Sequence, residues 1–91
     1  MGIEVRVPTV LRKHTDGERR VSGDGDRLGE LINDLGDRHN GLRDALVAHD
    51  GSLHRFINVY VNDEDVRFID GIDTPLSDGD VVSILPAVAG G

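Results

Sequence analysis

The first part of the chain has the hydrophobic pattern of a strand hairpin followed by a helix. Apolar and charged residues alternate over residues 3–7, as in a strand with one face in a core and the other in water. A polar turn at residues 13–17 precedes a weaker candidate strand at residues 18–22. From residue 25 to residue 39 the period becomes helical. We therefore predict two paired strands and then a helix.

The predicted helix has a single apolar face. Asp26 is its candidate N-cap, and residues 42–47 favour a further short helical turn. Gly29 and Gly36 each lower helix propensity by about 1 kcal/mol relative to alanine, so packing of the apolar face must hold this helix. The residues of that face recur at i, i+3, i+4 and i+7: Leu28, Leu31, Ile32 and Leu35.

The second half of the chain predicts three more strands. Residues 56–61 are rich in β-branched and aromatic side chains, residues 62–65 favour a turn, and residues 66–69 return as a strand. The apolar run at residues 81–85 predicts a strand buried on both faces, ending at Pro86. This order predicts an α+β fold with one main helix across a mixed sheet.

The length of 91 residues suits one domain, which we assign to residues 1–86, with a tail at residues 87–91. Phe56 stands beside Arg55, a composition favoured at protein interfaces, but a core position is the more frequent role of such a residue. We therefore expect Phe56 in the core.

Charge and composition exclude several classes of function. A net charge of −7 spread along the chain argues against nucleic acid and acidic partners, and favours a basic patch on another protein. The absence of cysteine removes disulfides, thiolate metal sites and cysteine nucleophiles. No apolar run approaches the roughly 20 residues that span a bilayer. We expect a cytoplasmic protein that binds neither membrane nor nucleic acid.

The side chains offer no catalytic or cofactor motif. The four histidines never place two ligands on one helical face, so we expect no metal site. The glycines at 23, 25 and 29 miss the phosphate-binding spacings, and no nucleophile elbow is present. We predict a protein that is not an enzyme and binds no cofactor, any nucleotide being held by a partner.

The tail is the candidate functional element. It contains only small uncharged residues, and five extended residues reach at most about 17 Å, which would carry the terminus into a cleft of a partner. A terminal carboxylate is ionised at neutral pH and must be activated, for example by adenylation, before it can acylate anything. The tail residues are Ala87, Val88, Ala89, Gly90 and Gly91.

The closing segment, DGDVVSILPAVAGG at residues 78–91, resembles the last strand and tail of the ubiquitin-like sulfur carriers of thiamin and molybdopterin synthesis, the ThiS/MoaD superfamily. Residues 59–68, VYVNDEDVRF, together with that ending, resemble the actinobacterial branch that supplies sulfur for cysteine synthesis. The resemblance covers nearly the whole chain and is strongest from His54 onward. Ala87, where molybdopterin carriers usually have a second proline, and the length of residues 40–53 set the chain apart from the other branches.

The resemblance implies a β-grasp fold and a thiocarboxylate formed on Gly91 after adenylation by an ATP-using activating enzyme. Ala87, Val88, Ala89 and Gly90 would enter the partner. It further implies a pyridoxal-phosphate-dependent cysteine synthase as acceptor and a metalloprotease that releases cysteine. Two other interpretations stay open: a protein modifier attached through Gly91 to lysines, and an interaction domain with an idle tail.

Overall fold

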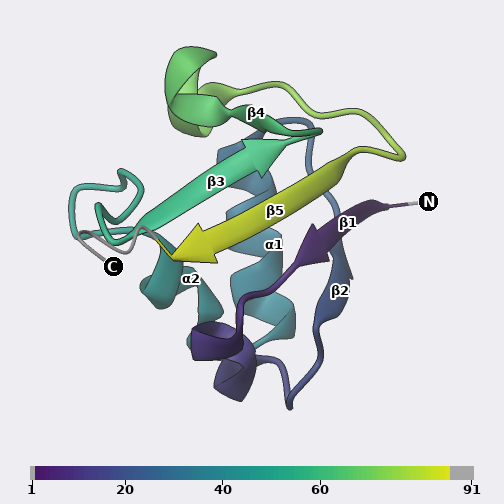
Figure 1. Ribbon diagram of the computed structural model, residues 1–91, viewed down its shortest axis with the longest axis vertical. Coiled ribbons are helices and arrows are strands. Elements are labelled where there is room, and N and C mark those ends of the chain that lie inside the picture. Colours follow the sequence, from purple (N-terminus) through teal and green to yellow (C-terminus); the bar gives the residue numbers. More distant parts are fainter. Residues whose placement is uncertain (1, 87–91) are drawn as a thin grey trace.

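The computed structural model describes residues 2–86, which build one five-stranded sheet with two helices behind it (Figure 1). The strands lie in the order β2-β1-β5-β3-β4. Their bounds are β1 Ile3–Arg6, β2 Arg20–Gly23, β3 Ile57–Val61, β4 Glu64–Asp65 and β5 Val81–Pro86. The α-helices are α1 Leu28–Arg38 and α2 Leu42–Leu46, and the 3-10 helices are η1 Thr9–His14, η2 Val66–Phe68 and η3 Gly71–Asp73.

The core lies between α1 and the back of the sheet. The four apolar residues of the predicted helix face are at most 3% exposed, which confirms that face. Each such side chain contributes about 1.5–3 kcal/mol through burial, enough to offset the low propensity of the two helix glycines. Ile3, Val5, Val59, Val82 and Ile84 meet them from the sheet. Within residues 2–86, no helix is both long and apolar enough to cross a membrane.

The last strand of the described chain occupies the centre of the sheet. β5 runs parallel to β1 and antiparallel to β3, so hydrogen bonds hold it on both sides. The chain between the parallel strands crosses behind the sheet through α1, as parallel pairing requires. A mixed sheet packed against one main helix is the predicted α+β, β-grasp architecture.

One predicted strand is wrong. Residues 66–69 do not return as a strand, because pairing with β3 ends after the two residues of β4 and the chain then turns into η2. The Asp65 carboxylate accepts the backbone N–H of Arg67 at 2.9 Å, which caps this 3-10 turn. The β-branched and aromatic composition of the segment was therefore misleading, since a local cap decided its conformation.

Two local expectations also need correction. β5 is not buried on both faces: Val82 and Ile84 are buried, whereas the alternate positions are partly or fully exposed, because helices cover only one face of this sheet. The N-cap of α1 is Arg27, and the backbone N–H of Asp26 instead donates to Glu30 Oε1 at 3.0 Å. The carboxylate of Glu30, in the first turn of α1, thus accepts a backbone N–H just before the helix, as in a capping box.

Candidate functional site

The predicted functional residues lie beyond the described part of the chain. Gly91 and the predicted tail residues Ala87, Val88, Ala89 and Gly90 fall outside residues 2–86, so their assignment stays a prediction. The structure instead describes the strand that leads to them. Pro86, the last described residue, pairs with Ile57 on β3. The described chain therefore stops at the end of the sheet where β3 begins.

β5 fixes the base of the tail and also contributes to the open face of the sheet. Val82 and Ile84 are 1% and 3% exposed and anchor the strand in the core. Leu85 is 47% exposed, and Ser83 is half-buried on the same face. A strand held by its buried side chains and by two neighbours presents Leu85 and Pro86 in a fixed direction.

Phe56 is exposed, so its predicted core position is wrong. Its side chain is 71% exposed, whereas Ile57, Val59 and Val61 are the buried residues of this segment. Phe56 lies in the turn just before β3 and not in the strand itself, so the alternation that buries Ile57, Val59 and Val61 does not extend to it. It therefore adds an aromatic side chain to the surface near the end of β5.

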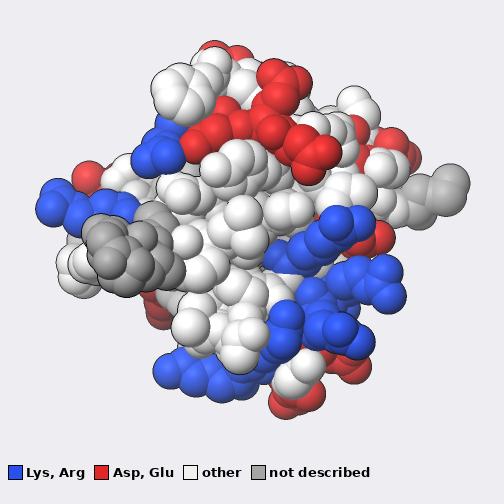
Figure 2. Space-filling model, in the orientation of Figure 1, with Lys and Arg blue, Asp and Glu red and all other residues white. Residues whose placement is uncertain are grey.

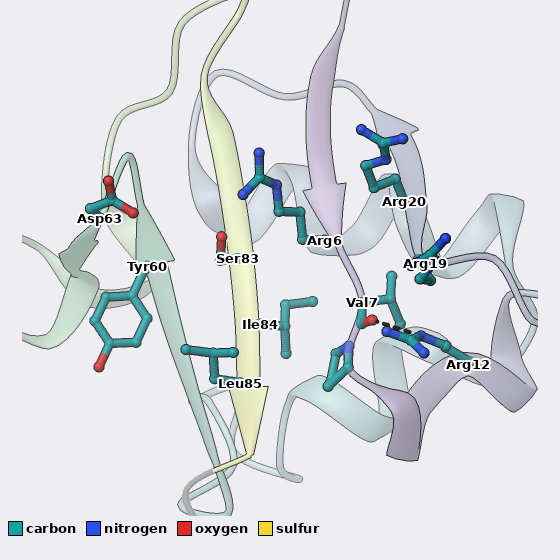
Figure 3. A pocket seen from close by; sticks show the side chains of 11 residues that line it. Arg6, Val7, Arg12, Arg19, Arg20, Tyr60, Asp63, Ser83, Ile84 and Leu85 are labelled. Atoms are coloured by element: carbon teal, nitrogen blue, oxygen red, sulfur yellow. Dashed lines mark hydrogen bonds between the residues drawn. The ribbon is translucent and has the colours of Figure 1, made fainter.

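A groove runs over the open face of the sheet beside β5. Its volume is about 650 Å³. Figure 3 shows arginines on the β1–β2 side of β5 and Tyr60 on the β3 side, with Leu85 between them. We call this feature the arginine groove and define it by Arg6, Arg12, Arg19, Arg20, Tyr60 and Leu85.

The charged side chains of the surface are segregated. In Figure 2, Lys and Arg gather over the β1–β2 side of the open face, Asp and Glu gather near β4, and uncharged residues lie between them. The acidic side contains the Asp65–Arg67 ion pair, with Nη2 and Oδ2 2.8 Å apart. The hydrogen bonds between these two side chains lower the pKa of Asp65 and raise the pKa of Arg67. A partner would meet a polarised surface.

A second carboxylate with a lowered pKa, that of Asp50, lies in the loop before β3. The pKa of Asp50 is lowered because Ser52 donates hydrogen bonds to its carboxylate. Within residues 2–86, no three His, Asp or Glu side chains are grouped to hold a metal ion. The arginine groove itself offers recognition, through guanidinium groups and apolar side chains.

Sequence reasoning missed the arginine groove. Arg19 and Arg20 join Arg6 only because β2 folds back on β1, and Leu85 joins them only because β5 inserts beside β1. The sequence did carry one signal: Arg6 and Arg20 occupy exposed, charged positions of two strands in which buried and exposed residues alternate. The positive charge of this side of the sheet therefore depends on how the strands pair.

Comparisons with known proteins agree with this architecture. The chain matches the ThiS family over residues 5–91. It is 53% identical to the sulfur carrier protein CysO of Mycobacterium tuberculosis, over the whole of both chains. It is 39% identical to small archaeal modifier protein 3 of Haloferax volcanii, over 79% of this chain and 76% of that one.

A solved structure gives the same result. One chain in the crystal structure of the Amycolatopsis orientalis BexX/CysO complex superposes with a TM-score of 0.91. The two chains are 53% identical, and the match covers 98% of this chain and 99% of the other. The family match includes the two terminal glycines, and the fold match includes the sheet that leads to them. The chain belongs to the ThiS family of ubiquitin-like β-grasp proteins.

Proposed function

We propose that this chain is a sulfur carrier protein. Its C-terminal Gly91 carboxylate is adenylated by an activating enzyme and converted to a thiocarboxylate, which donates sulfur in biosynthesis. Cysteine is the favoured product, and other sulfur-containing metabolites are the alternatives. The observation that carries the proposal is the family match, because it runs to residue 91 and so includes the terminal Gly-Gly. The full-length identity of 53% to CysO supports the same role.

The chemistry requires little of this chain beyond its terminus. A carboxylate oxygen of Gly91 attacks the α-phosphorus of ATP, and pyrophosphate leaves. A hydrosulfide equivalent from a sulfur donor then attacks the carbonyl carbon of the acyl-adenylate, AMP leaves, and a thiocarboxylate remains. The partner binds ATP and supplies catalysis, so this chain acts as a carrier and needs no cofactor of its own. Glycine at the terminus lets the partner's groups approach closely.

The partners are those that this scheme requires. The activating enzyme is the first, and a pyridoxal-phosphate-dependent cysteine synthase that accepts the sulfur is the second. A metalloprotease that releases cysteine from the carrier is the third. These reactions belong to the cytoplasm. That a 53% identical carrier crystallises in complex with BexX supports the expectation that this chain also works by docking on other proteins.

A second candidate function is protein modification through Gly91. The 39% identity to a small archaeal modifier protein favours it. Both functions share the acyl-adenylate and differ in the next reaction, because a lysine amine replaces the sulfur nucleophile. A proteome-wide search for lysines that bear a Gly-Gly remnant, with and without the gene for this chain, separates them. The digestion uses a protease that cleaves after small residues such as Ala89, because the last basic residue before the terminus is Arg67. Abundant gene-dependent conjugates would favour the modifier.

Activation of the terminus tests both functions together. The full-length chain and a variant lacking Gly91 are incubated with ATP and the activating enzyme, and exchange of pyrophosphate into ATP is measured. We expect exchange with the full-length chain alone. Equal exchange with both forms would refute activation at Gly91.

A further inference from the structure

The arginine groove carries positive charge in a chain whose net charge is −7. Four arginines border it, on the same side of β5 (Figure 3). The ion pairs of residues 2–86 include neither Arg12, Arg19 nor Arg20. A chain with 17 acidic residues and 10 basic ones would readily supply acidic neighbours. One carboxylate, that of Asp63, also lines the groove, but it lies on the β3 side of β5, away from the arginines (Figure 3). No ion pair within residues 2–86 joins it to an arginine, so internal neutralisation does not explain this cluster.

Two of these arginines face each other across a strand pair. Arg6 on β1 and Arg20 on β2 are direct partners in the antiparallel register. Like charges at directly opposed positions of a strand pair are destabilising. Glu4 reaches Arg6, with Nε and Oε2 3.0 Å apart, but Arg20 has no such neighbour among the described residues. The fold therefore tolerates a repulsion that an external carboxylate would relieve.

The floor of the groove favours a protein surface over a small ion. Tyr60 and Leu85 are uncharged, and Leu85 is 47% exposed. A volume of about 650 Å³ is far larger than one inorganic anion needs. Arginine beside tyrosine and exposed apolar groups is the composition of interface hot spots. The groove therefore fits a segment with both apolar side chains and carboxylates.

We propose that the arginine groove docks an acidic segment of a partner protein, whose carboxylates pair with the arginine border while an apolar ridge covers Tyr60 and Leu85. Leu85 is followed by Pro86 and then by the five residues that end at Gly91. The docked protein is accordingly one that acts on the terminus, and this identity of the partner, unlike the docking itself, rests on the proposed function. The sign of the docking face is opposite to what the net charge predicts.

The arginines and the apolar floor have different effects on binding. Guanidinium groups form bidentate hydrogen bonds with carboxylates and fix orientation. A single exposed ion pair adds little affinity, but several together add more, and all of them accelerate encounter and are screened by salt. The apolar floor supplies the salt-independent part of the binding. We therefore expect complex formation to slow as ionic strength rises, with a smaller change in dissociation.

The test uses the full-length ¹⁵N-labelled chain and an acetylated peptide in which glutamate alternates with valine and phenylalanine. A second peptide carries glutamine in place of glutamate. We expect the acidic peptide to shift the backbone amide signals of Arg6, Arg20, Ser83 and Leu85, with an affinity that falls with added salt. The glutamine peptide should bind at least about tenfold more weakly, a difference of about 1.4 kcal/mol.

Two matched charge reversals separate binding from folding. Arg20→Glu should weaken the acidic peptide about tenfold while the midpoint of thermal unfolding stays equal or rises, because the reversal converts the repulsion with Arg6 into attraction. Arg27→Glu, an exposed arginine outside the groove, makes the same change in net charge and should leave binding unchanged. Equal weakening by both reversals would reduce the effect to net charge and overturn the proposal.

Three further results would overturn it: no shifts with the acidic peptide, shifts confined to the α1 side, or equal shifts with inorganic phosphate, which would indicate a small-anion site. These readouts do not involve sulfur. If Gly91 is never activated but the peptide binds as described, the proposed function fails and the docking groove stands. If Gly91 is activated and the peptide does not bind, the docking groove fails and the proposed function stands.

Discussion

The side chains of Asn62 and Asp80 join the turn after β3 to the turn before β5. Asn62 Nδ2 donates to Asp80 Oδ1 at 2.9 Å, and Asn62 Oδ1 accepts the backbone N–H of Val81 at 3.0 Å. Asn62 has a φ of 51°, in the left-handed region that asparagine tolerates better than most residues. One residue thus ends β3 and sets the register of the strand that leads to the C-terminus.

Replacement of Asn62 should separate its two contributions. Asn62→Gly keeps the positive φ without strain and loses the side-chain hydrogen bonds, for a cost of about 1 kcal/mol. Asn62→Ala loses the same bonds and adds backbone strain, for a total of about 2 kcal/mol. Urea denaturation of both variants measures the difference. Equal stability of the two would show that strain at this turn is negligible.

Gly36 should be required by the crossing of α1 and α2. A Cβ atom at this position would lie 2.6 Å from Arg43 Cβ, which is attached directly to the α2 backbone. We expect Gly36→Ala to destabilise the fold by about 1 kcal/mol, because the overlap outweighs the gain in helix propensity. At Gly29 the nearest atom is Ile72 Cγ1, at 3.1 Å.

The matched Gly29→Ala substitution serves as the control, since the Ile72 side chain can move aside. Its stability should stay within about 0.5 kcal/mol of the parent, measured by thermal unfolding. A Gly36→Ala variant as stable as Gly29→Ala would mean that the two helices separate without cost.

Phe56 should contribute little to folding. Because its side chain is 71% exposed, Phe56→Ser should change the free energy of unfolding by less than about 0.5 kcal/mol. Val59, which is 3% exposed on the adjoining strand, provides the comparison: Val59→Ala should cost about 2 kcal/mol. Denaturant titrations of both variants measure the two costs. A Phe56→Ser variant as unstable as Val59→Ala would place Phe56 back in the core.

The Asp65 carboxylate should make stability depend on acidity. Its pKa in the folded chain is lowered below 3.8 by the hydrogen bond from Arg67, so its contribution is complete above the unfolded pKa of about 3.9 and is lost as pH falls through the folded value. Asp65→Asn should cost about 1 kcal/mol at neutral pH, mainly through the weaker cap of η2. That difference should vanish in acid.

Unfolding of both forms between neutral pH and pH about 3 measures this dependence. Asp37→Asn, at an exposed position of α1, is the control and should show no comparable change. A cost for Asp65→Asn that is the same at every pH would exclude the ionised carboxylate as its source.

Much of the fold followed from periodicity, and the exceptions have local physical causes. The helical spacing of Leu28 and Leu35 predicted a helix with one face in the core, and both residues are buried. The alternation around Val5 predicted a strand with one buried face, as β1 has. The segment after Asp65 was mistaken for a strand because composition cannot show that a carboxylate caps it. Helix propensity alone marks Gly36 as unfavourable, whereas the structure shows that a Cβ atom at this position would overlap Arg43.

The site divides in the same way. Gly91 is recognisable from the sequence because a Gly-Gly terminus and its preceding strand are contiguous. The arginine groove is not contiguous: Arg6, Arg20 and Leu85 come from three strands whose order requires the whole topology. Net charge predicted a preference for basic partners, but the register places arginines together on the face beside β5. Charge counted along a chain does not give the charge of a surface.

Intact-mass spectrometry of the full-length chain tests the central claim most directly. The chain is incubated with ATP, the activating enzyme and a sulfide source, beside a variant lacking Gly91 that unfolds at the same denaturant concentration. We predict that the full-length chain gains the mass difference between sulfur and oxygen, that fragmentation locates the gain at Gly91, and that the shortened chain gains nothing. An unchanged mass after demonstrated adenylation of the terminus would contradict the assignment of this chain as a sulfur carrier.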